Sequence, residues 1–173
     1  MAAAALDAAR KALPAGSPLS LRALDDDLID LQIDGVLRAL VEMSAGDDGE
    51  AAVPVRLAVC AHDDAMPLGA SQPASSHVFA DISARGQRLL ARLEALPAAE
   101  RLPVLSRWLS SYHDLFTAPC AHCGRHLPAV AGAAPLLPPT VRTSSGAAYS
   151  AQCFAACSLD DVEEGWLDAA ASG

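Results

Sequence analysis

Apolar residues recur at helical spacing in the first third of the chain. Between Leu21 and Met43 they fall three to five residues apart, which predicts a single amphipathic helix with one apolar face. Ser20 can cap the start of this helix and Gly46 follows its end, as is usual at helix termini. The positions that carry the pattern are Leu21, Leu24, Leu28, Leu31, Val36, Leu40 and Met43.

Two more amphipathic helices are predicted before the late cysteines. Apolar residues at helical spacing run from Val78 to Leu96, and Pro97 closes that stretch. The most regular pattern lies between Leu102 and Phe116, where apolar residues alternate in steps of three and four. Pro119 ends this last helix and Cys120 follows at once.

Strict alternation of apolar and other residues is found in residues 53–60, which predicts one strand near a sheet edge because Pro54 lies at its start. The fold class expected from these patterns is α+β and mainly helical: amphipathic helices, one short strand region and a C-terminal zinc knuckle. The expected organisation is an N-terminal helix or flexible tail, a helical or α+β middle region, a zinc-binding C-terminal module and an acidic tail, over residues 1–16, 17–117, 118–158 and 159–173.

Composition and charge narrow the classes of function. Apolar residues make up 52% of the chain, but 38 of the 173 residues are alanine, so the core is thin and we expect it to lean on a partner. The formal charge is −9, which disfavours a basic face for nucleic acid or for anionic membranes. We find no targeting segment and no uncharged apolar run of about 18 residues, so we expect a soluble, intracellular protein.

Four of the five cysteines follow the spacing C-x2-C-x29-C-x3-C and are the candidate metal ligands: Cys120, Cys123, Cys153 and Cys157. Two thiolates two residues apart converge on one point, and a tetrahedral zinc ion needs two further ligands, which a second pair on one helical turn can supply. In an intracellular chain this pattern favours a structural Zn²⁺ ion over disulfides. The alternative is that these are small uncoordinated core cysteines.

The identity of the fourth ligand stays open at this point. His126 lies three residues past Cys123 and can serve if Cys157 does not, and no fourth protein ligand is a further alternative. His122 lies inside the turn, where we expect its side chain to point away from the metal. Cys60, His62, His77 and His113 are interpreted as ordinary residues.

Two enzyme classes use a similar cysteine pair. Nucleobase deaminases combine P-C-x-x-C with an upstream H-x-E, whose Glu transfers protons. The nearest upstream segment here is His62-Asp-Asp64, which lacks the Glu. Thioredoxin-like enzymes place the pair between a strand and a helix, whereas here a predicted helix precedes it. We therefore expect no enzyme, no catalytic residue and no small-molecule substrate; a deaminase-type zinc enzyme or a nucleic-acid-binding zinc finger is the alternative.

The same region resembles the C-terminal part of the Mediator subunit 27 family. The resemblance is carried by residues 112–127, which contain Pro119-Cys-Ala-His-Cys-Gly124, and by Leu137-Pro-Pro-Thr140. Weaker matches extend it over roughly residues 30–157. This chain has Val141 where the family has Trp, and Ser150 at the place of the family's His before the last Cys; Arg142 is retained.

The resemblance implies a non-enzymatic, scaffolding subunit of the Mediator coactivator, acting in RNA polymerase II transcription in the nucleus. It implies other Mediator subunits as partners, near the junction of the head and tail modules, and no direct contact with nucleic acid or membrane. Because the family has a longer helical N-terminal region, the chain is interpreted as a reduced or truncated member.

Overall fold

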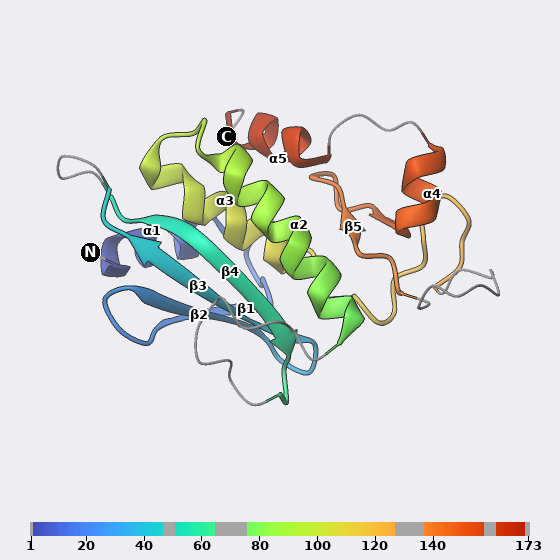
Figure 1. Ribbon diagram of the computed structural model, residues 1–173, viewed down its shortest axis with the longest axis horizontal. Coiled ribbons are helices and arrows are strands. Elements are labelled where there is room, and N and C mark those ends of the chain that lie inside the picture. Colours follow the sequence, from blue (N-terminus) through green and yellow to red (C-terminus); the bar gives the residue numbers. More distant parts are fainter. Residues whose placement is uncertain (1, 47–50, 65–75, 127–136, 158–161, 172–173) are drawn as a thin grey trace.

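The computed structural model describes residues 2–46, 51–64, 76–126, 137–157 and 162–171 of the chain (Figure 1). It contains a four-stranded sheet, a two-stranded ribbon and several helices. In chain order the elements are α1 (Ala2–Ala12), β1 (Leu19–Ala23), β2 (Leu28–Ile33), β3 (Leu37–Ser44), β4 (Val53–Ala61), α2 (His77–Leu93), α3 (Ala98–Ser110), β5 (Val141–Arg142), β6 (Ala148–Tyr149), α4 (Ala151–Ala156) and α5 (Val162–Ala171).

The large sheet is an antiparallel meander in the order β1-β2-β3-β4. Leu21 pairs with Leu31 across β1 and β2, and Leu31 pairs with Ala39 across β2 and β3. The hairpin between β2 and β3 turns at Gly35, whose φ of 70° suits glycine. Short turns therefore join β1 to β2 and β2 to β3.

The single helix predicted from Leu21 to Met43 is wrong, because this stretch forms three strands. On the face of β2 and β3 that meets the helices every residue is apolar and buried, whereas the other face mixes polar side chains with the buried Leu40; the residues of the first face are Ile29, Leu31, Ile33, Leu37, Ala39, Val41 and Met43. Leucines are frequent enough here that steps of three to five also occur by coincidence. The acidic residues at 25–27 and the Asp34-Gly35 pair are turn signals that divide the stretch.

The predicted fold class is corrected accordingly: the chain is not mainly helical, and its strands are not confined to one short region. The strand expected over residues 53–60 is confirmed as β4, and the helix expected over 78–96 is confirmed as α2. The next helix ends at Ser110 instead of Phe116, and a series of turns continues to residue 117. The N-terminal stretch is a helix, α1.

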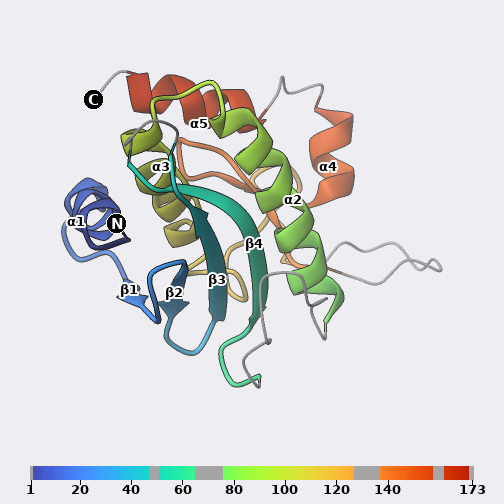
Figure 2. The same cartoon turned by 60° about the vertical axis from the view of Figure 1, so that its left-hand side comes forward.

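Helices α1, α2 and α3 pack against one face of the sheet (Figure 2). The core between these layers contains Leu31 and Val41 from the sheet and Ile82 and Leu105 from the helices. At Gly86 the backbone of α2 comes so close to the sheet that an added Cβ would lie 2.2 Å from Cδ2 of Leu57. This position therefore requires glycine for close packing.

Side chains of α2 bond to the backbone of β4, which is the last strand of the sheet. The Ser83 hydroxyl accepts a hydrogen bond from the Val59 amide at 2.9 Å and donates to the Val59 carbonyl at 3.4 Å. The Gln87 amide nitrogen donates to the Leu57 carbonyl at 2.8 Å. These bonds fix α2 along β4.

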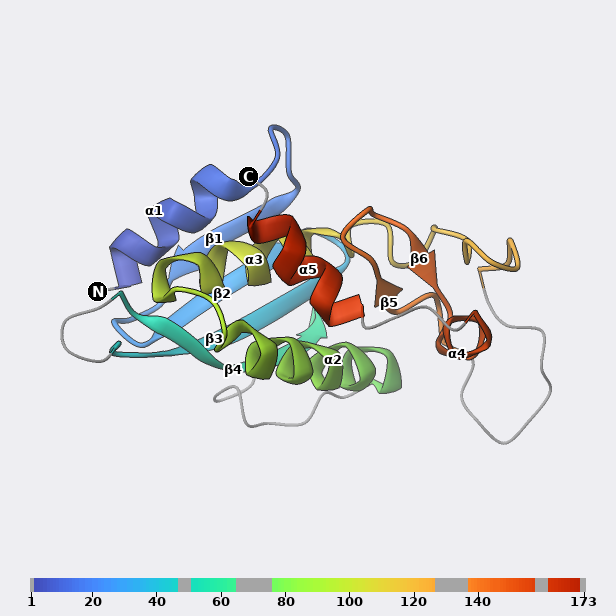
Figure 3. The same cartoon turned by 90° about the horizontal axis from the view of Figure 1, so that it is seen from above.

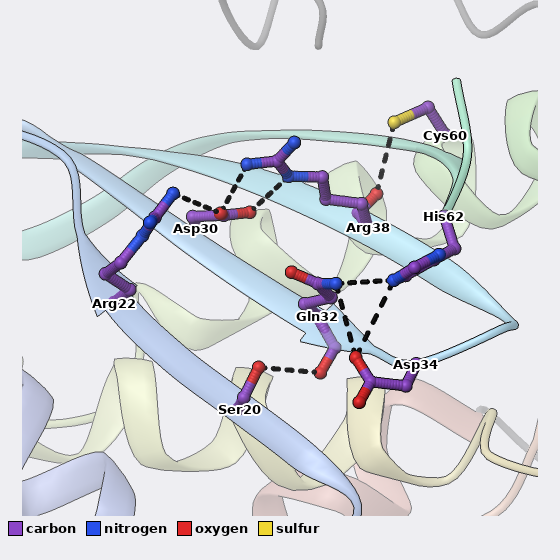
Figure 4. Close-up of polar contacts among 8 residues, drawn as sticks. All are labelled: Ser20, Arg22, Asp30, Gln32, Asp34, Arg38, Cys60 and His62. Atoms are coloured by element: carbon purple, nitrogen blue, oxygen red, sulfur yellow. Dashed lines mark hydrogen bonds and ion pairs between the residues drawn. The ribbon is translucent and has the colours of Figure 1, made fainter. Parts of the chain in front are cut away.

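The opposite face of the sheet carries a polar cluster (Figure 4). Asp30, only 3% exposed, accepts two hydrogen bonds from the Arg38 guanidinium, at 2.8 and 2.6 Å, and a longer one from Arg22. Farther along the strands, His62 contacts Gln32 and lies 3.6 Å from a carboxylate oxygen of Asp34. Each of these groups has a partner within the cluster.

None of the helices in the described part of the chain is long and apolar enough to cross a membrane.

Candidate metal centre

Three of the four predicted ligands come together at the end of the molecule that carries β5, β6 and α4. The sulfur atoms of Cys120, Cys123 and Cys153 all lie within 4.8 Å of one another. Zinc–sulfur bonds of about 2.3 Å in a tetrahedron place sulfurs about 3.8 Å apart. Three thiols at this separation therefore fit a tetrahedral metal ion.

The turn that carries the first two cysteines is closed by its own backbone. The Gly124 amide donates to the Cys120 carbonyl at 2.8 Å, and the Cys120 amide donates to the Arg125 carbonyl, also at 2.8 Å. Gly124 has a φ of 69°, a conformation that favours glycine. The Ala121 amide donates to the Ala148 carbonyl at 2.7 Å, which attaches the turn to β6.

The third cysteine lies in the first turn of α4. The Ser150 hydroxyl caps this helix by accepting a hydrogen bond from the Cys153 amide at 3.3 Å. The Ser150 amide in turn donates to the sulfur of Cys120 at 3.4 Å. Ser150, which stands where the related family has His, thus links the two cysteine segments without being needed as a ligand.

The surroundings of Cys120 favour its thiolate. Burial raises the pKa of Cys120, but backbone amides of Cys123, Ser150 and His122 donate to the sulfur and together lower that pKa to about 6. The thiolate is the form of cysteine that binds metals. Cys120 is thus a buried sulfur prepared for a cation.

The pKa of Cys153 moves in the opposite direction. The Ser150 hydrogen bond lowers it, but burial, contacts with the thiols of Cys123 and Cys120 and the negative charge of Cys120 together raise it. Thiolates crowded at one point repel each other, and a bound cation removes that repulsion. The donor set therefore fits a metal that prefers sulfur, such as zinc.

Cys157, also predicted as a ligand, lies outside this group of three sulfurs. It follows the last turn of α4, and its sulfur is 3.2 Å from Nδ1 of His122. His126, the alternative fourth ligand, has Nε2 3.4 Å from the Leu115 carbonyl. The structure thus brings three sulfurs together and leaves Cys157 beside them, paired with the histidine of the turn.

Sequence reasoning missed the residues that join this region to the helices. Tyr112, in the turns that follow α3, donates a hydrogen bond from its hydroxyl to the Thr140 carbonyl at 2.8 Å. The Thr140 hydroxyl donates to Asp81 of α2 at 2.6 Å, and Arg85 donates to the same carboxylate oxygen of Asp81. Thr140, in the Leu137-Pro-Pro-Thr140 segment, thereby ties the start of the strand ribbon to α2 and to the turns after α3.

Arg142 makes a second connection. Its side chain is 1% exposed and donates to Asp114 at 2.7 Å, with the guanidinium 5.3 Å from the centre of the Tyr112 ring. Trp166 of α5 donates its indole N–H to the Arg142 carbonyl at 2.9 Å. Two guanidinium nitrogens, Nε and Nη2, have no hydrogen-bond partner in the described part of the chain.

The deaminase alternative requires a carboxylate beside the metal. Within the described residues, the carboxylates of Asp and Glu and the nitrogens of His do not join the three sulfurs within the same 4.8 Å. His62, from the segment that comes closest to the H-x-E pattern, belongs instead to the polar cluster on the sheet (Figure 4). The three-sulfur group therefore has, among the described residues, no carboxylate in the position that the deaminase chemistry uses.

Comparison with known families gives one match. Residues 72–157, about half of the chain, match the family model of Mediator complex subunit 27. The matched range includes α2, α3, the cysteine turn, β5, β6 and α4, and it excludes the four-stranded sheet. No curated protein matches the chain.

Proposed function

The chain belongs to the Mediator complex subunit 27 family, and from this premise we propose that it is a non-enzymatic scaffold in Mediator. Membership implies association with other Mediator subunits, a role in transcription regulation and a nuclear location. The finer part of the proposal is that the chain acts in RNA polymerase II transcription near the junction of the head and tail modules, without contacting nucleic acid itself.

The observation that supports a scaffold is the group of three sulfurs at the tip of the matched region. Cys120, Cys123 and Cys153 would hold one Zn²⁺ ion, with Cys157 as the fourth protein ligand after a small movement of the end of α4. Zinc supplies no reaction here; it neutralises the thiolates and links their backbone segments.

The proposed link has a mechanical consequence. The cysteine turn is attached to β6, and the ribbon that contains β6 is fixed to α2 through Thr140 and to the turns after α3 through Arg142. A metal that joins the cysteine turn to α4 would therefore fix α4 relative to α2 and to the segment that follows α3. The surface offered to neighbouring subunits would then have one shape, which lowers the entropy cost of assembly.

Metal content of the purified full-length chain tests this proposal. We expect about one zinc per chain, and we expect it to be lost when Cys120→Ser is combined with Cys123→Ser. Cys60→Ser is the matched control, because Cys60 is buried in the sheet and lies outside the group of three sulfurs. Cys157→Ser identifies the fourth ligand: weaker zinc retention against a chelator supports Cys157, whereas unchanged retention assigns the position to another group.

The same variants test the scaffold role. In cells, the tagged chain should co-purify with other Mediator subunits, and the double cysteine variant should recover less of them than the Cys60→Ser control does. A metal-free chain with unchanged unfolding behaviour would contradict the zinc site. Normal recovery of Mediator by the zinc-free variant would contradict its role in assembly.

A further inference from the structure

A pocket of about 600 Å³ is lined by residues other than the cysteines. It is formed where α5 passes over α3 beside the connection from α1 to β1 (Figure 3). Residues 14–18 form one wall, α3 contributes Arg107, and α5 contributes Trp166 and Ala169. Three segments distant in sequence therefore meet around one opening.

The lining is mainly apolar with a cationic side. Pro14, Ala15, Trp166 and Ala169 provide apolar surface, and Arg107 provides a permanent positive charge. The described lining residues include no Asp or Glu, although the whole chain carries a formal charge of −9. Arg107 is thus the only permanently charged side chain among the described lining residues.

Most other polar groups of the pocket already have partners. The hydroxyls of Ser17 and Ser110 bond to each other at 2.8 Å, and the Ser111 hydroxyl donates to the Trp108 carbonyl at 2.6 Å. Arg107 differs, because its Nε is enclosed and has no hydrogen-bond partner in the described part of the chain. Arg107 lines the pocket, and an incoming carboxylate would pair with its positive charge.

We propose that this pocket binds an acidic peptide segment of a partner protein, with an apolar side chain against Trp166 and Ala169 and a carboxylate on Arg107. The volume accommodates one large side chain and its neighbours, and the arginine fork suits a carboxylate. A peptide is the fitting class because the chain belongs to a family of subunits that work in a protein assembly. The inference rests on this membership and not on the zinc site.

The probe is a fluorescein-labelled peptide, Gly-Asp-Phe-Asp-Leu-Gly, added to the full-length chain and followed by fluorescence anisotropy. We expect saturable binding that weakens as salt is raised. The counterpart with Asn in place of both Asp should bind at least about tenfold more weakly, since hydrogen bonds between charged groups contribute more than neutral ones. The counterpart with Gly in place of Phe and Leu should also lose affinity.

Two variants locate the site. Arg107→Gln should weaken binding by about tenfold or more, and Ser144→Trp should block the opening from an exposed lining position. Arg22→Gln removes the same charge from β1, where the side chain is 68% exposed, and should leave binding unchanged. Circular dichroism of each variant establishes that it is folded.

The inference would be overturned by equal binding of the acidic and neutral peptides, by unchanged affinity in Arg107→Gln, or by no binding to the folded wild-type chain. The double cysteine variant separates this inference from the proposed zinc site. Lost peptide binding in Arg107→Gln with normal zinc content supports the pocket alone, whereas zinc loss with retained peptide binding leaves the pocket intact.

Discussion

The sheet and the C-terminal region differ in how fully a buried charged side chain is hydrogen-bonded. In the sheet, the buried Asp30 carboxylate receives a two-point hydrogen bond from Arg38 and a further contact from Arg22. In the C-terminal region, the equally buried Arg142 uses one nitrogen on Asp114 and leaves Nε and Nη2 without a partner among the described residues. The buried Asp30 carboxylate is thus paired within the sheet, whereas the buried Arg142 guanidinium has two nitrogens that make no hydrogen bond to the described residues.

The family match follows the same division. Residues 72–157 include Arg142 and the three grouped sulfurs but exclude the whole four-stranded sheet. Groups with unused capacity are where a metal, ordered water or a partner chain is expected to bind. The part of the chain that matches the family is thus the part that contains the grouped sulfurs and the buried guanidinium nitrogens without a hydrogen-bond partner among the described residues.

Removing Arg142 would test the C-terminal side of this comparison most strongly. Arg142→Ala removes a fully buried side chain and leaves the Asp114 carboxylate without its cation, so we expect a loss of about 3 kcal/mol in the free energy of unfolding. Urea denaturation followed by circular dichroism measures it. A loss below about 1 kcal/mol would mean that the desolvation penalty of burying the guanidinium nearly cancels the free energy gained from its contacts.

Close packing at Gly86 gives the next largest expected effect. In Gly86→Ala, the new Cβ would lie 2.2 Å from Leu57 and 3.2 Å from the ring of Trp108, so we expect a loss of about 2 kcal/mol despite the better helix propensity of alanine. Gly165→Ala in α5 is the matched control, because its added Cβ would lie 3.3 Å from the Ser144 hydroxyl oxygen, the end of a small side chain. Thermal unfolding of both variants gives the comparison; equal melting temperatures would contradict it.

The smallest expected effects concern the polar cluster on the sheet. Asp30→Asn removes the charge that Arg38 binds, and we expect a loss of about 1.5 kcal/mol in the free energy of unfolding. Arg22→Gln should cost less than about 0.5 kcal/mol, because that side chain is largely exposed and its contact is 3.4 Å long. Urea denaturation distinguishes the two; similar losses would show that the cluster does not depend on the buried pair.

Some elements could be predicted from sequence because one pattern dominated them. In β4 the alternation of Val53, Leu57 and Val59 had no helical competitor, and α2 had both a capping serine and a terminating proline. The first three strands were missed because their leucines also fit helical steps. The deciding signal was the turn chemistry at residues 25–27 and at Asp34-Gly35, which interrupts any helix.

The structure brings together three of the four cysteines that the sequence singled out, because C-x2-C turns and a cysteine in a helical first turn can converge on one point; that they bind a metal stays a prediction. The place of Cys157 was not predictable from spacing alone. It depends on where α4 ends and on the orientation of His122. The contacts of Thr140 and Arg142 were also beyond sequence reasoning, since both depend on how the strand ribbon packs against α2 and α3.

Helix α2, which lies along β4, limits how other proteins can bind at this edge of the sheet. A terminal strand normally offers free amides and carbonyls to any extended chain, which invites strand-by-strand growth and aggregation. Here Ser83 and Gln87 occupy backbone groups of Val59 and Leu57, so a visiting strand would find them already taken. Neighbours that dock along β4 must therefore recognise side chains and surface shape, and these positions of β4 are protected from pairing with another strand.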